Sequence, residues 1–259
     1  MLSPSEIVAS IEKSSLQKIG FSANKTLLLA FLAGAYIAIG GLLSISIGYG
    51  FPGISQFNPG LQKLLSGTFF PIGLILVVVA GAELFTGNNA VLIPSLLNRS
   101  YGISKLLKNW TTVYIGNFAG ALFVAYFLTY LTGIFDVEPW HGSIIKLAET
   151  KTSLSFGNAF LRGVGCNWLV CLAVWLGTAS TDMTGKCLGI WFPVMCFVAL
   201  GFEHSIANMF FIPIGMMVGA DVSVSGFIFG NLVPVTLGNI AGGAMFVGAY
   251  YWYVYKRCC

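Results

Sequence analysis

The chain has 259 residues, of which 56% are hydrophobic and only 8% are charged, and its formal net charge is +4. Soluble domains carry about 25% charged residues, so an ordinary soluble enzyme and a disordered chain are both excluded. A polytopic membrane protein is left, long enough for roughly six or seven crossings. The sequence has no base-reading motif, so nucleic acid is not an expected partner.

The first predicted element is a short helix over residues 3–19. Ser3 is a helix N-cap, Pro4 takes the first helical position and Glu6 reaches back to the cap. Gly20 is a natural stop. Apolar residues gather near one face among Glu and Lys, which predicts an interfacial helix and not a membrane span.

Six apolar segments follow this helix. They cover approximately residues 26–51, 67–98, 106–134, 156–180, 187–218 and 228–254. The segments are continuously apolar and do not alternate, which favours helices over a β-barrel. The second and the fifth are too long for one crossing and are interrupted by polar residues, so we expect both to be broken helices.

The distribution of basic residues predicts the orientation. Six spans place both termini on one side of the membrane. If both termini are on the cytoplasmic side, nine of the 13 Lys and Arg residues lie in the cytoplasm and four lie outside. This bias predicts that both termini are cytoplasmic in a multi-pass protein of the cell membrane.

Two motifs occur once in each half of the chain. The pattern G-x-E-x-x-x-x-N covers residues 81–88 and again 201–208, at an offset of 120 residues. The pattern G-N-x-A-G covers residues 116–120 and again 238–242, at an offset of 122. Each half has three spans, so two duplicated halves must enter the membrane in opposite senses. Inverted repeats with interrupted helices in matching positions are typical of transporters and channels.

This pattern predicts a single all-α transmembrane domain over residues 1–259. Its expected parts are the interfacial helix 1–20, a first repeat 26–134, an outer loop 135–155, a second repeat 156–254 and a cytoplasmic tail 255–259.

Glu83 and Glu203 lie at matching positions in the two interrupted segments. A carboxylate at membrane depth must be paired, protonated or bonded to backbone amides. One interpretation is substrate coordination or a proton relay. We favour a structural one, in which each Glu holds the loop of a broken helix, because an anion site disfavours an exposed carboxylate.

His204 is the only histidine expected at membrane depth, since His141 falls in the outer loop. A histidine at a helix break can donate a hydrogen bond or exchange a proton with a weak-acid anion. Thr86, at the break of the other half, supplies a hydroxyl to the same substrate or bonds only within its own loop.

Three cationic residues fall near the predicted membrane boundaries. Lys18 and Lys151 lie on opposite sides, and Arg162 lies at the outer start of the fourth segment. A cation beside a pore mouth concentrates anions, although most such side chains only snorkel to the interface.

Four stretches of the chain resemble the signatures of the formate/nitrite transporter family. They are residues 78–87 (VVAGAELFTG), 163–173 (GVGCNWLVCLA), 201–209 (GFEHSIANM) and 234–239 (PVTLGN). The resemblance covers nearly the whole chain. It implies an aquaporin-like fold of six helices, with the second and fifth broken, assembled as a homopentamer with one pore in each protomer.

The resemblance also implies a substrate and site residues. The substrate is a small anion: formate first, or nitrite, hydrosulfide or lactate. His204 would be the central residue that bonds the anion and exchanges protons, opposite Thr86, with Asn167 and Asn239 supporting the site. Lys18 and Lys151 would attract anions at the two vestibules, and the apolar constrictions would be formed by Phe70, Leu74, Leu84 and Phe197.

Other functions fit the sequence less well. A water or glycerol channel would carry Asn-Pro-Ala pairs, which are absent. A redox subunit or membrane enzyme would need haem ligands or a catalytic constellation that two histidines do not supply. The six cysteines form no CxxC pair, so no metal or cofactor is expected. Cys258 and Cys259 form either a lipidated end or a plain tail.

Overall fold

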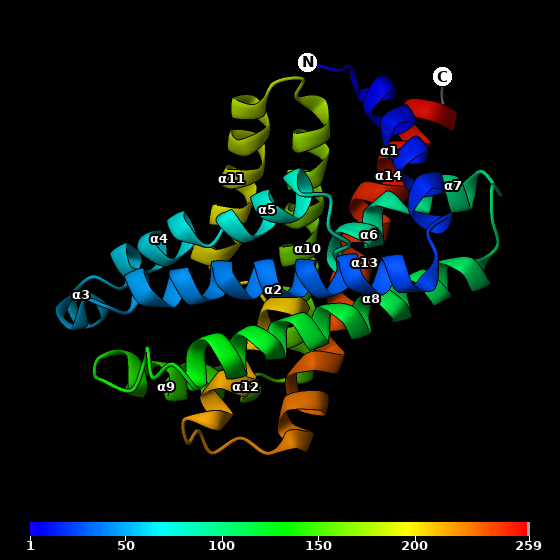
Figure 1. The fold of residues 1–259 in the computed structure, drawn as a ribbon. Helices are drawn as coiled ribbons and strands as arrows, with labels where there is room; N and C mark the ends of the chain where they lie inside the picture. Colours follow the sequence, from blue (N-terminus) through cyan, green and yellow to red (C-terminus); the bar gives the residue numbers. More distant parts are fainter. Residues whose placement is uncertain (258–259) are drawn as a thin grey trace.

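The computed structural model describes residues 1–257, so Cys258 and Cys259, whose modification the sequence left open, lie outside the described residues. The described part is built from helices and turns without a β-strand (Figure 1). The helices of its first half are α1 (Pro4–Ile19), α2 (Ala23–Gly48), α3 (Pro52–Phe57), α4 (Pro59–Phe69), α5 (Ile72–Val79), α6 (Phe85–Val91), α7 (Ile93–Leu97), α8 (Ile103–Phe123) and the π-helical η1 (Val124–Tyr130).

The second half begins after a connection of nine residues. Its helices are α9 (Trp140–Thr152), α10 (Phe156–Ala179), α11 (Met183–Leu200), α12 (Ser205–Met217), η2 (Gly226–Leu232), α13 (Val233–Gly243), η3 (Ala244–Ala249), α14 (Tyr250–Trp252) and η4 (Tyr253–Arg257), of which η2, η3 and η4 are π-helical. Helices α1 and α14 lie at the same end of the molecule (Figure 1).

Six helices in residues 1–257 are long and apolar enough to cross a membrane. They cover Ala23–Gly48, Pro59–Val79, Ile103–Tyr130, Phe156–Ala179, Met183–Leu200 and Gly226–Lys256. The all-helical class and the six membrane-capable helices agree with the prediction. Helix α1 is capped as the sequence indicates, since the backbone N–H of Ser3 donates to the Glu6 carboxylate over 2.7 Å. This bond lowers the pKa of Glu6 below its ordinary value.

Two regions of the chain that were not predicted to be helical are helices in the structure. The second spanning helix begins at Pro59, eight residues earlier than predicted, because the polar Gln62 and Lys63 are accommodated on its half-buried and exposed surface. Residues 135–155, expected as a loop, contain the whole of α9. Its Ile144 and Ala148 are buried against the core, which gives this polar stretch a reason to be helical.

The chain leaves the helical conformation at two matching places. Helix α5 ends at Val79 and α6 begins at Phe85, while α11 ends at Leu200 and α12 begins at Ser205. Each stretch has a left-handed glycine, Gly81 at φ +73° and Gly201 at φ +72°. Such angles favour glycine because a side chain would clash with the backbone. In each stretch a Glu follows two residues later, in the middle of the nonhelical segment.

Close helix contacts fix these two stretches in place. Helix α2 packs along α8, and α10 packs along α13. A Cβ added at Gly120 would overlap the carbonyl oxygen of Phe31, and one at Gly242 would overlap that of Val164. Small residues let membrane helices approach backbone to backbone, so the repeated G-N-x-A-G motif marks the two tightest helix pairs around the nonhelical stretches.

Candidate functional site

Most of the site residues predicted from the sequence line two hollows. The first, the Lys18 hollow, has a volume of about 390 Å³ and is lined by Thr178 near the end of α10. The second, the Lys151 hollow, has a volume of about 320 Å³ and is lined by Arg162 near the start of α10. The two hollows therefore lie toward opposite ends of this helix.

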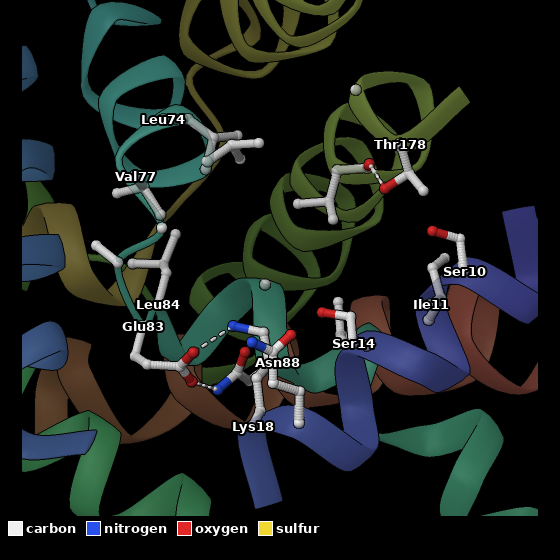
Figure 2. A pocket seen from close by; sticks show the side chains of 18 of the residues that line it. Ser10, Ile11, Ser14, Lys18, Leu74, Val77, Glu83, Leu84, Asn88 and Thr178 are labelled. Carbon is white, nitrogen blue, oxygen red and sulfur yellow. Dashed lines mark hydrogen bonds and ion pairs between the residues drawn. The ribbon is translucent and has the colours of Figure 1, made fainter. Parts of the chain in front are cut away.

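The Lys18 hollow is held together by an ion pair. Figure 2 shows Lys18 of α1 beside Glu83, with Leu74 and Leu84 above the carboxylate. Lys18 Nζ lies 2.5 Å from Glu83 Oε1. The other carboxylate oxygen, Oε2, accepts a hydrogen bond of 2.8 Å from Asn88 Nδ2. Glu83 is only 1% exposed, so its charge is balanced by Lys18 and bonded by Asn88 within the protein.

The Lys151 hollow has the same arrangement on the other half of the chain. Lys151 Nζ lies 2.9 Å from Glu203 Oε1, and Asn208 Nδ2 donates to Glu203 Oε2 over 2.6 Å. Glu203 is 4% exposed. Lys18 and Lys151 thus come from elements far from the two glutamates in sequence, and each pairs with the carboxylate of one nonhelical stretch.

The four residues predicted to form apolar constrictions divide between the hollows. Leu74 and Leu84 line the Lys18 hollow. Phe70 and Phe197 line the Lys151 hollow, with ring centroids 5.7 Å apart in an edge-to-face arrangement. All four side chains are buried.

Thr86 and His204 are in contact beside the Lys151 hollow, which His204 lines together with Phe70 and Phe197. Thr86 Oγ1 lies 2.8 Å from His204 Nε2, and both residues are buried. His204 is also the N-cap of α12, because its Nδ1 accepts the backbone N–H of Ala207 over 3.1 Å. The lone pair of Nδ1 is therefore in use, and a neutral imidazole carries its proton on Nε2, facing Thr86.

Asn167 and Asn239 contact backbone atoms of the two nonhelical stretches. Asn167 Nδ2 donates to the carbonyl oxygens of Thr86 over 3.1 Å and Asn239 over 2.7 Å. Asn239 Nδ2 donates to the carbonyl oxygen of Glu203, and its Oδ1 accepts the N–H of Ser205. The free backbone groups at this helix start are therefore bonded by an amide side chain and not by the glutamate.

Sequence reasoning assigned no role to five further asparagines. Asn117 binds the first nonhelical stretch as Asn239 binds the second, through the N–H of Phe85 and the carbonyl oxygen of Glu83. Asn88 and Asn208 bind the glutamates. The repeated motifs contain these three residues and were the available signal. Asn109 and Asn231, which accept from Asn88 and Asn208, lie outside the repeated motifs, so nothing in the sequence marked them.

A family model described as formate/nitrite transporter matches residues 5–253. The chain belongs to the formate/nitrite transporter family. As a member of this family, with six membrane-capable helices, it is a multi-pass membrane transport protein and not an enzyme.

Individual relatives agree with this assignment. A "probable formate transporter" of Methanothermobacter thermautotrophicus is 50% identical over 247 residues, which cover 90% of this chain and 89% of the relative. A solved "FNT family ion channel" has a TM-score of 0.88 at 30% identity and covers 96% and 98% of the two chains. A solved "pentameric formate channel with formate bound" has a TM-score of 0.80 at 36% identity, with coverages of 90% and 97%.

Proposed function

We propose that this family member is a channel for small monovalent weak-acid anions, with formate as its principal substrate. Nitrite, hydrosulfide and lactate are the alternatives through the same site. The observation that carries the proposal is the buried Thr86–His204 hydrogen bond, whose histidine lines the Lys151 hollow, in a protein with a lysine-containing hollow toward each end of α10. The names of the formate-transporting relatives support formate over the other anions.

The lysines give the pathway its preference for anions. An ammonium group has three N–H donors, and Lys18 and Lys151 each use one on a glutamate. The remaining donors attract an anion at each end of the pathway. Asn88 and Asn208 occupy the second oxygen of each carboxylate, which reduces the repulsion that a free carboxylate would exert on an entering anion.

The two pairs of apolar side chains determine the energy barrier to anion passage and the largest anion that can pass. A dehydrated anion pays a large desolvation cost between Leu74 and Leu84 or between Phe70 and Phe197, whereas its neutral acid pays little. A small anion passes if a hydrogen-bond donor meets it between the pairs. Larger anions are excluded by the width of the two constrictions.

Thr86 and His204 supply that donor. With Nδ1 of His204 occupied by the N–H of Ala207, its Nε2–H donates to Thr86 Oγ1, and the hydroxyl hydrogen of Thr86 is left for the anion. Because the neutral imidazole already carries its proton on Nε2, proton exchange with the substrate requires protonation of Nδ1, which breaks the hydrogen bond from the N–H of Ala207. The Nε2–H of the resulting imidazolium is then given up on the side that faces Thr86. Hydrogen bonding through Thr86 and proton exchange at His204 thus share one polar contact.

The same proposal extends to the assembly and its orientation. Residues 1–259 form a single transmembrane domain of two inverted halves, an interpretation supported by the matching φ angles of Gly81 and Gly201. The domain lies in the cell membrane with both termini in the cytoplasm, as the excess of Lys and Arg on that side favours. Five copies assemble with a pore in each, in line with the similarity to a pentameric formate channel.

The test is transport by the purified protein in liposomes. We expect formate uptake to exceed that of nitrite, hydrosulfide and lactate across a series of pH values. Replacing Thr86 by Val keeps the shape but removes the hydroxyl, and should abolish the preference for formate. Swelling in neutral solutes without anion flux would contradict the proposal and favour a water or glycerol channel.

A further inference from the structure

A third hollow lies beside the transport pathway and shares Lys18 with it. This hollow, the Lys105 groove, has a volume of about 150 Å³ and lies between the end of α1, the start of α2 and the start of α8. Its basic side chains are Lys18, Lys105 and Lys108. Among the described residues that line it there is no Asp or Glu, although the ammonium of Lys18 is paired with Glu83, which lies outside the groove.

The groove lies where the exposed apolar surface of the membrane-capable helices begins. It lies over the first turns of α2 and α8, which begin two of the six membrane-capable helices. Ile19 and Phe21 complete its wall. On the same helical turns, Leu28 is 68% exposed and Leu107 is 53% exposed, so an apolar surface suited to acyl chains begins next to the basic groove.

The polar groups in the groove match a phosphate. Lys105 and Lys108 are three residues apart and so share one face of α8, near the helix N-terminus, whose dipole favours an anion. Asn109 and Thr112 add an amide and a hydroxyl to the same wall. Basic pockets between membrane helices on the cytoplasmic side are suited to anionic lipid headgroups.

We propose that the Lys105 groove binds the phosphate headgroup of an anionic phospholipid. A free phosphate would find the same ammonium groups but would leave Ile19, Phe21 and the adjoining apolar surface unused. The groove is distinct from the pathway, because Lys105 and Lys108 line neither the Lys18 hollow nor the Lys151 hollow.

The lipid would nevertheless contact the network around Glu83. Lys18 lines both the groove and the Lys18 hollow. Asn109 also lines the groove, and its Oδ1 accepts a hydrogen bond of 3.1 Å from Asn88, the residue that donates to Glu83. A bound headgroup therefore lies next to two residues that hold the charge balance of the pathway.

The test is lipid binding by the full-length protein in a neutral detergent. Fluorescent phosphatidylglycerol and phosphatidylcholine with the same acyl chains are titrated against the wild type, K105Q/K108Q and K13Q/K146Q. The last variant removes two exposed lysines outside all three hollows. We expect the wild type and K13Q/K146Q to prefer phosphatidylglycerol, and K105Q/K108Q to lose that preference by about tenfold or more.

Three results would overturn the proposal. They are equal binding of the two lipids by the wild type, equal losses in the two double variants, and displacement of phosphatidylglycerol by millimolar inorganic phosphate, which would make free phosphate the ligand. The charge reversal K105E provides an independent check, since it should weaken phosphatidylglycerol binding more than K105Q does. The melting temperature of each variant shows that it is folded before lipid is added.

Discussion

At the scale of single residues, the molecule repeats one arrangement of Lys, Glu and Asn in each half of the chain. Lys18, Glu83 and Asn88 form one copy, and the second copy consists of Lys151, Glu203 and Asn208. A buried carboxylate is stable only when its charge is compensated. Each lysine therefore has two tasks in our proposal, to neutralise its glutamate and to attract the substrate.

Removal of Lys151 should destabilise the protein, because it leaves Glu203 buried without a cation. We expect K151Q to cost about 3–5 kcal/mol of unfolding free energy, and E203Q in the same chain to restore part of it. Denaturation in detergent measures both. The matched control is K256Q, which breaks the more exposed pair with Glu12 and should cost at most about 1 kcal/mol. Equal losses in K151Q and K256Q would contradict the compensation argument.

His204 should determine how transport responds to pH. An Asn at this position can still cap α12 but does not titrate. We therefore expect H204N liposomes to conduct formate with no dependence on pH between about 5 and 8. T86S, which retains the hydroxyl, serves as the control and should keep the wild-type profile. An unchanged pH profile in H204N would rule out proton exchange at the histidine.

At the scale of secondary-structure elements, the close helix pairs decide where the nonhelical stretches lie. Gly242 of α13 leaves no room for a side chain against the backbone of α10, whereas a Cβ at Gly157, at the start of α10, would meet no atom within 4 Å. G242A should cost about 1–3 kcal/mol through overpacking. G157A should be neutral or stabilising, because Ala is the better helix former. Thermal unfolding in detergent compares them, and equal melting temperatures would contradict the packing argument.

The cap of α11 is expected to depend on pH. Asp182 Oδ1 accepts the N–H of Gly185 over 2.7 Å, and this bond lowers the pKa of Asp182 below its ordinary value. A lowered pKa stabilises the fold above the unfolded-state value of 3.8, and that stabilisation is lost as the pH falls through the folded-state value.

The measurement is the melting temperature of the wild type and two variants at pH 7 and pH 3. D182N keeps an oxygen acceptor that does not titrate, so it should lose less stability than the wild type on acidification. D182A has no acceptor and should melt lower than D182N at both values. If the wild type and D182N shift equally with pH, the cap does not contribute through its charge.

Much of the secondary structure could be predicted from the sequence. The two interrupted segments and the helix at the N-terminus follow from capping residues, glycines and apolar runs, which act within a few neighbouring residues. The sequence did not predict α9 or the early start of the second spanning helix. Helix α9 is a polar stretch whose helical form depends on the burial of Ile144 and Ala148 against other elements. The early start of the second spanning helix contains the polar Gln62 and Lys63, which interrupt the apolar pattern but lie on half-buried and exposed surface.

At the scale of the whole molecule, the protomer leaves large apolar faces uncovered. Helix α11 is the least buried of the six membrane-capable helices, with 17% of its most apolar window inside the protomer. Its Leu188, Phe192 and Leu200 are exposed. Such faces must meet either lipid or other copies of the chain, since water would not tolerate them.

A pentamer can be tested directly by native mass spectrometry in detergent. We expect one dominant species with five chains, each of 27.7 kDa. Crosslinking at dilute concentration, followed by denaturing gel electrophoresis, is the control for artificial association. A dominant monomer, dimer or trimer by both methods would contradict the pentamer while leaving the transport proposal open to its own test.

The sequence by itself determined the membrane class, the number of spanning helices, the two special stretches and the family resemblance. These depend on composition, local capping and motif spacing, all of which are readable along the chain. Only the tertiary structure decided that Lys18 and Lys151 pair with Glu83 and Glu203, that Thr86 meets His204, and that asparagines bind the free backbone groups. Those contacts join residues from 32 to 118 positions apart, with separations of 65 and 52 for the two lysines. Burial makes such polar groups costly without partners, and only the packing of distant helices supplies them.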